Sequence, residues 1–157
     1  MKTASISDIK QELNNIEPAK LLELCLRLAK YKKDNKELLN YLLFEAHDEQ
    51  AYIRNVKTAI EEAFKDINQS NLYFAKKSLR KILRTTAKYI RYTASKQAEV
   101  ELLLHFCETL QHSGIPVKNS AVINNLYQFQ LKKIAKLIAT LHEDLQYDYL
   151  KELDKLM

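Results

Sequence analysis

Apolar residues recur at steps of three and four positions along almost the whole chain, and polar residues fill the positions between them. This spacing matches the α-helical period of about 3.6 residues, so each apolar series marks one face of a helix. Asn, Asp, Ser, Gly and Pro interrupt the series at intervals. The pattern predicts seven or so helices, at about residues 5–14, 18–33, 36–46, 49–67, 70–92, 96–112 and 120–156.

The breaks differ in strength. The firmest is 113–116, because Gly114 suits a helix C-cap and Pro116 cannot continue a helix. Asp48 is the expected N-cap after a corner at 47–50, and Ser70 is the expected cap of the next helix. In the last segment the apolar series runs on to residue 153. One long helix and two helices with a bend near Asp144 both fit that segment.

The composition narrows the fold class. One glycine and two prolines in 157 residues are too few turn formers for an all-β or α/β fold, so we expect an all-α protein. The length suits one domain over residues 1–157. Two architectures fit the short connections: an antiparallel helical bundle, or a short HEAT-like α-solenoid stack. The segments do not align with one another, so no repeat decides between the two.

The segment 70–92 has two sharply different faces. Its apolar positions fall in an arc of roughly 120° when they are placed on a helix, and its cations fall in a separate arc of roughly 140°. No acidic residue occurs between Asp66 and Glu99. We call the second arc the basic face. It contains Tyr73, Lys76, Lys77, Arg80, Lys81, Arg84, Lys88 and Arg91.

The positive charge of the chain is concentrated in this region. The net charge is +5, yet residues 67–98 contain eight bases and no acid. The rest of the chain therefore has a net negative charge. A local basic patch indicates an anionic partner more than an evenly high isoelectric point does.

The basic face is the candidate binding site, and it suggests two functions. The first is a protein-interaction or scaffold module that binds an acidic protein partner or associates with itself. The alternative is a nucleic-acid-binding protein that contacts the phosphate backbone without reading sequence. Tyr73 can stack on a base, and Lys132, Lys133 and Lys136 offer a second cationic stretch. The plainest alternative is that acids of the same chain, such as Glu61, Glu62 and Asp66, pair with these cations.

Catalytic chemistry has no support in the sequence, and we expect neither an enzyme nor a cofactor. The chain contains no nucleophile elbow, P-loop or dinucleotide-binding motif. Glu101, His105, Glu108 and His112 share one arc of roughly 60° and include metal-ligand types. That arc lies opposite the apolar face of its helix, so we expect the four side chains to face water and to hold no metal.

Cys25 and Cys107 lie among leucines, and we expect two buried, reduced thiols. The first residues lack the apolar stretch of a signal peptide, and no apolar run reaches transmembrane length. We therefore expect a cytoplasmic protein with no membrane insertion.

Overall fold

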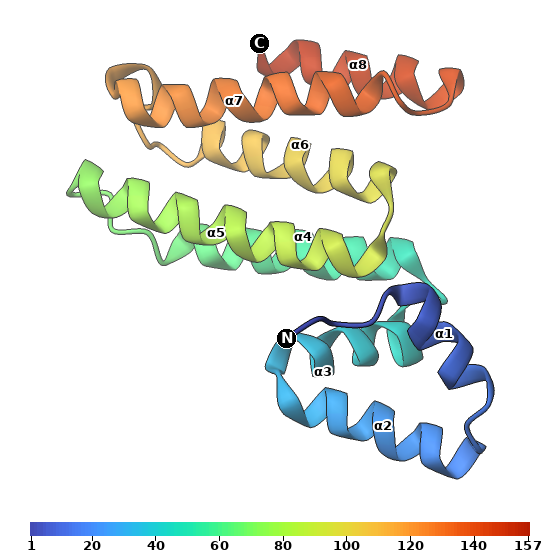
Figure 1. Cartoon of the computed structure of the whole chain (residues 1–157). Helices are drawn as coiled ribbons and strands as arrows, with labels where there is room; N and C mark the ends of the chain where they lie inside the picture. The colour runs from blue at the N-terminus through green and yellow to red at the C-terminus, as the bar shows by residue number, and fades with distance from the viewer. The chain divides into compact units, whose positions relative to one another are not determined.

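A computed structural model describes all 157 residues, and it is helical throughout, with no strand (Figure 1). The predicted all-α fold is confirmed. The chain divides into two compact units, an N-terminal unit of residues 1–44 and a C-terminal unit of residues 45–157. The expectation of one domain over the whole chain stays a prediction, and each unit is described by itself.

The N-terminal unit contains three short helices and the start of a π-helical segment. These elements are α1 (Ile6–Asn14), α2 (Pro18–Tyr31), α3 (Lys33–Asn40) and the π-helical segment Tyr41–Glu45. Ser5 and Asp8 form a reciprocal capping box at the start of α1. Pro18 occupies the first turn of α2, where its missing N–H costs no hydrogen bond.

The main packing contact in the N-terminal unit joins α2 and α3. Asn35 Nδ2 donates to Leu28 O at 2.9 Å across this contact. No residue of α1, α2 or α3 is buried. The spacing in residues 36–46 predicts a buried face of Leu38, Leu39, Leu42, Leu43 and Ala46. That prediction is wrong, because none of the five is buried, and Leu42 and Leu43 are 56% and 63% exposed.

The C-terminal unit contains the longer helices. They are α4 (Glu49–Lys65), α5 (Leu72–Thr93), α6 (Lys96–His112), α7 (Ala121–Ile138) and α8 (Glu143–Leu156), with a 3-10 turn at Val117–Asn119.

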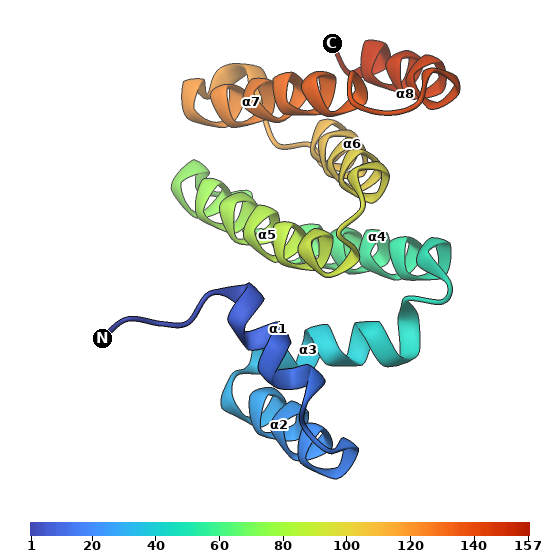
Figure 2. The same cartoon turned by 45° about the vertical axis from the view of Figure 1, so that its right-hand side comes forward.

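The helices of the C-terminal unit form three layers (Figures 1 and 2). The middle layer is α6, which packs against α4 and α5 on one side and against α7 and α8 on the other. Leu102, Phe106 and Leu110 of α6 are completely buried, and the ring of Phe106 lies 5.4 Å from that of Phe64. Apolar residues on nearly every side of α6 let one helix serve two interfaces.

The predicted caps explain most helix boundaries. Asp48 accepts a hydrogen bond from Ala51 N at the start of α4, as predicted. The cap of α5 is Asn71, one residue after the predicted Ser70. Between α5 and α6, Ala94 adopts the left-handed conformation at φ 51° and ψ 22°, and Ser95 caps α6. Ser95 Oγ also donates to Glu49 Oε1 of α4 at 3.0 Å, which ties this joint to the first layer.

The last segment forms two helices, so the alternative with one long helix is excluded. The chain turns at 139–142, just before the predicted bend near Asp144. His142 caps α8 by accepting from Asp144 N, and Gln146 Nε2 donates back to Leu141 O at 2.8 Å. Tyr127 of α7 donates to Leu156 O at 2.8 Å and fixes the far end of α8.

Candidate interaction face of α5

The basic face lies on α5 because the opposite side of that helix is needed for the core. Ala75 and Leu79 are completely buried, and Ile82, Thr86 and Ile90 continue the same stripe toward α4 and α6. The cations occupy positions that remain once this stripe is packed. The period of the sequence alone therefore predicts the direction in which they point.

The side chains of the basic face differ in exposure. Tyr73, at the start of the face, is 61% exposed. Lys76 and Lys88 are half-buried. The exposed cations are Lys77, Arg80, Lys81, Arg84 and Arg91.

These five exposed cations have no acidic partner in the chain. Two of the acids considered as partners contact other groups: Glu62 pairs with Lys65 at 2.6 Å, and Glu61 lies 3.0 Å from His105. Intramolecular neutralisation of Arg80 and Arg84 is therefore not seen. The positive potential of this face remains available to a ligand.

Two aromatic rings contact cations of the same helix. Lys76 Nζ lies 5.2 Å from the centre of the Tyr73 ring, and Lys88 Nζ lies 5.5 Å from the centre of the Tyr89 ring. Cation–π contacts contribute only about 0.5–1 kcal/mol at exposed sites. Tyr73 also meets Phe74 edge-on, with ring centres 5.6 Å apart.

The second cationic stretch, on α7, is partly neutralised. Lys132 and Lys136 are exposed, but Lys133 Nζ lies 2.7 Å from Glu99 Oε1 of α6. The three lysines do not form an uninterrupted extension of the basic face.

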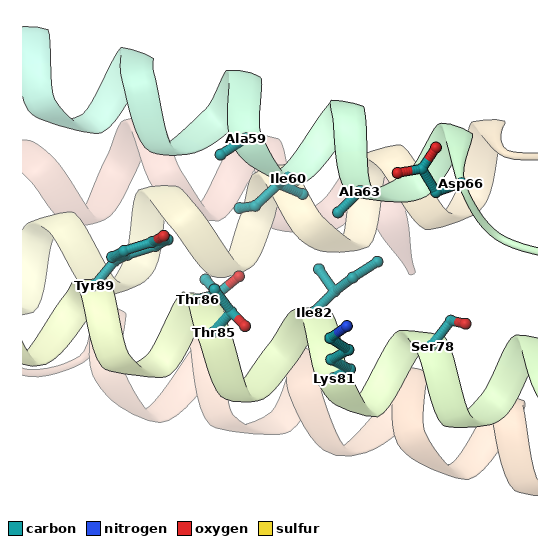
Figure 3. A pocket seen from close by; sticks show the side chains of 10 residues that line it. All are labelled: Ala59, Ile60, Ala63, Asp66, Ser78, Lys81, Ile82, Thr85, Thr86 and Tyr89. Atoms are coloured by element: carbon teal, nitrogen blue, oxygen red, sulfur yellow. The ribbon is translucent and has the colours of Figure 1, made fainter. Parts of the chain in front are cut away.

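A groove runs beside the basic face, between α4 and α5 (Figure 3). Its volume is about 330 Å³, and its walls carry mainly short or apolar side chains. Ala59 and Ala63 of α4 face Ile82 and Thr85 of α5 across it, as Figure 3 shows. Lys81 belongs both to this lining and to the basic face.

The ends of the groove are polar. Asp66 and Ser78 lie at one end and Tyr89 lies toward the other (Figure 3). Sequence reasoning missed this groove, because it depends on which helix packs beside α5. The signal in the sequence is weak: small residues occur at positions 59, 63, 78 and 85.

The predicted solvent-facing arc of α6 is only half right. Glu108 and His112 are exposed as expected, but the side chains of Glu101 and His105 are only 14% and 18% exposed. The prediction was wrong for these two residues because α6 is the middle layer, and its polar side lies between α4 and α8.

Glu101 is held by three groups from three helices. Tyr149 of α8 donates to Glu101 Oε1 at 2.8 Å, and Gln97 of α6 donates to the same oxygen at 3.3 Å. Lys57 of α4 lies 3.6 Å from Oε2. Burial, together with the hydrogen bond to this carboxylate, raises the pKa of Tyr149 well above its ordinary value. These polar contacts of Glu101 link α6 to α4 in one neighbouring layer and to α8 in the other.

His105 is half-buried near Lys57, Glu61 and Glu108. Burial lowers its pKa below the ordinary 6.5, and nearby Lys57 lowers it further, while Glu61 and Glu108 oppose the shift. Nε2 of His105 lies 3.0 Å from Glu61 Oε1, but the two groups are not aligned for a hydrogen bond. No group of three or more His, Cys, Asp or Glu side chains in the chain is arranged to hold a metal ion.

The two cysteines are in opposite environments. Cys107 is completely buried, as predicted, and burial raises the pKa of its thiol to about 12. Cys25 is exposed, so the prediction of a buried thiol is wrong there. The main packing contact of its helix, α2, is with α3.

The chain has no helix of the length and apolar character needed to span a bilayer. No protein-family model matches the chain, and the searches of curated proteins and of solved structures also found no match.

Proposed function

We propose that this chain is a non-enzymatic helical binding module, and that its C-terminal unit binds an acidic segment of a protein partner along α5. The observation that carries this proposal is the set of exposed, unpaired cations centred on Arg80 and Arg84. Arginine presents a planar fork of donors that matches a carboxylate in two parallel hydrogen bonds.

The spacing of the cations suits a helical ligand. Lys77, Arg80, Lys81 and Arg84 are separated from their neighbours on this face by steps of three or four residues, and Arg91 lies seven residues beyond Arg84. These steps correspond to about 5–6 Å along the helix axis. Acidic residues on a second helix repeat at the same interval, so several carboxylates of an acidic amphipathic helix can meet these cations together.

The groove supplies the apolar part of such a site. An amphipathic helix binds by placing apolar side chains in a groove while its polar edge faces outward. The α4–α5 groove lies directly beside the basic face and shares Lys81 with it. A ligand helix that sets its carboxylates on Arg80 and Arg84 therefore brings its apolar edge toward Ala59 and Ala63.

Exposed apolar side chains at the start of α5 favour a protein partner further. Leu72, Tyr73 and Phe74 are 40%, 61% and 48% exposed. Aromatic and arginine side chains are the types that most often dominate protein–protein binding energy. A phosphate backbone would make little use of Leu72 and Phe74.

Nucleic acid is the second candidate, and Tyr73 is the observation in its favour. A ring that is 61% exposed beside a row of cations can stack on a base while the cations contact phosphates. Binding of this kind would be directed to the backbone and would weaken steeply with salt. The pairing of Lys133 with Glu99 counts against an extended phosphate track across α7.

The free thiols of Cys25 and Cys107 fit a reducing compartment, so a cytoplasmic location is part of the proposal.

Fluorescence anisotropy across a salt series tests the proposal with three labelled probes. They are a helical peptide with Glu on one face and Leu on the other, single-stranded DNA and double-stranded DNA. We expect micromolar binding of the peptide that is lost in the double variant Arg80→Glu, Arg84→Glu. Lys132→Glu with Lys136→Glu is the matched control, because it changes the net charge equally on exposed lysines of α7.

Ala59→Leu separates the two candidates. Ala59 is exposed on the wall of the groove, so the larger side chain fills the groove with little cost to folding. Weaker peptide binding with unchanged DNA binding would support the groove. Binding of DNA alone, with no response to Ala59→Leu, would replace the protein partner with nucleic acid.

A further inference from the structure

The N-terminal unit leaves its apolar residues unburied. Tyr41 is the one residue among residues 1–44 that is buried. Besides Met1, twelve large apolar side chains of this unit are exposed: Ile6, Ile9, Leu13, Leu21, Leu22, Leu26, Leu28, Tyr31, Leu38, Leu42, Leu43 and Phe44. Several of them, such as Leu28 at 60% and Leu43 at 63%, are more than half exposed.

A unit built in this way lacks the burial that folding requires. Segments of about 40 residues seldom bury enough surface to fold alone, and they usually need disulfides, metals or oligomerisation. Cys25 is a free thiol, and no metal-holding group is present. Helices as short as α1 and α3, with nine and eight residues, are also marginal without a packed face.

The exposed surface includes a defined groove on the α2–α3 hairpin. Cys25, Leu28 and Ala29 of α2 face Leu38 and Leu39 of α3, and Leu42 closes the lining. The volume of the groove is about 290 Å³. The π-helical segment that follows α3 also contains Leu43 and Phe44, two consecutive exposed apolar residues.

We propose that a second copy of this chain covers this surface, and that two α2–α3 hairpins pair about a two-fold axis as a four-helix arrangement. A hairpin with one apolar side is the usual half of such a bundle. A second copy is present whenever the chain is made, so it is always available to cover the exposed apolar side chains of residues 1–44.

The available area and charge agree with a pair of copies. At roughly 80 Å² for each half-exposed apolar side chain, the nine that lie on α2, α3 and the segment after α3 present on the order of 700 Å². Each partner in a stable interface contributes about 800 Å². Residues 1–44 contain eight bases and six acids, a net charge of only +2, so two copies repel each other only weakly.

Sedimentation equilibrium on the full chain tests the pairing at concentrations from about 1 to about 300 µM. We expect a mass that rises from 18.4 kDa to twice that value and then stops. The double variant Leu28→Glu, Leu42→Glu should remain at the monomer mass. A wild-type chain that stays monomeric, or a mass that grows beyond two copies, would overturn the closed dimer.

Two controls separate this surface from the rest of the molecule. Phe129→Glu makes the same kind of change at a side chain of α7 that is 64% exposed, and it should leave the dimer intact. Arg80→Glu with Arg84→Glu should also leave the dimer intact. Loss of the dimer in that second variant would assign self-association to α5 instead and would refute the pairing through α2–α3.

The thiol of Cys25 gives a readout that does not depend on variants folding well. Cys25 lines the groove, whereas Cys107 is completely buried and stays silent while the C-terminal unit is folded. We expect Ellman's reagent to react with Cys25 of the wild-type chain at least severalfold more slowly at high than at low protein concentration. An equal rate at both concentrations would show that the groove stays open.

Discussion

The two units of this chain use similar sequence patterns with opposite results. In residues 1–44, apolar residues at helical spacing form three helices in which no side chain is buried. In residues 45–157, the same spacing forms a layered core in which Phe106, Ile123 and Ile134 have no exposed surface. The difference lies in the main packing contacts, since α6 packs against four helices, whereas the main contact of α2 is with α3.

The comparison shows that amphipathicity and burial are separate properties. Periodicity fixes which side chains of a helix share a face, but only a neighbouring helix removes that face from water. A unit without such neighbours stays open to a partner. The N-terminal unit therefore suits association, and the C-terminal unit suits the rigid display of a binding face.

The sharpest test of this difference is to truncate one aromatic ring in each unit. Phe106→Ala should lower the free energy of unfolding by about 3–5 kcal/mol, because it empties a completely buried site beside Phe64. Phe44→Ala, at a ring that is 67% exposed, should change it by less than about 0.5 kcal/mol. Urea denaturation followed by circular dichroism measures both. Equal losses would contradict the division into a packed and an open unit.

Hydrogen bonds between helices should show a smaller contrast. Tyr149→Phe removes the donor to Glu101 from a half-buried site between α6 and α8, and should cost about 1.5 kcal/mol. Asn35→Ala removes the exposed bond from α3 to Leu28 O, and should cost less than about 0.5 kcal/mol in the N-terminal unit. Tyr147→Phe is the control on α8, because that side chain is 64% exposed. A similar loss in Tyr147→Phe would contradict the assignment of the stability loss to the hydrogen bond between Tyr149 and Glu101.

The two cysteines give the smallest expected effect, on alkaline stability. The folded chain keeps the Cys107 proton up to a pKa of about 12, whereas the unfolded chain releases it from about pH 9. The folded state therefore binds more protons above pH 9, and the free energy of unfolding falls as the pH rises. Between pH 8.5 and 10 the loss should be about 1 kcal/mol.

Urea denaturation across that pH range checks the slope. Cys107→Ala should remove most of the loss, whereas Cys25→Ser should leave it unchanged because Cys25 is exposed. An unchanged slope in the first variant would assign the alkaline loss to other groups, such as Tyr127, whose pKa burial also raises to about 12.

The sequence was sufficient to predict the helices and the direction of the basic face. Asp48 caps α4 as expected, and the break at 113–116 ends α6. Arg80 and Arg84 are exposed because the stripe that includes Leu79 and Ile82 is buried. Each of these results depends on residues within one helix or one turn, where local spacing and capping decide the structure.

The errors concern neighbours that lie far apart in the sequence. Leu42 and Leu43 were expected to be buried, but no helix of the N-terminal unit covers them. Glu101 and His105 were expected in water, but α4 and α8 enclose them. The groove of Ala59 and Thr85 exists only because α4 packs beside α5. A single sequence does not specify these pairings, because its periodicity carries no information on which faces meet.

The joint at Ala94 also bears on how the basic face is presented. A residue with a side chain in the left-handed conformation is strained by roughly 1–2 kcal/mol, and glycine would relieve that strain. Alanine has fewer backbone conformations than glycine, so it makes a stiffer hinge between α5 and α6. A ligand then meets a surface that is already in place and loses little free energy in ordering it. The same backbone strain at Ala94 lowers the free energy of unfolding of the chain.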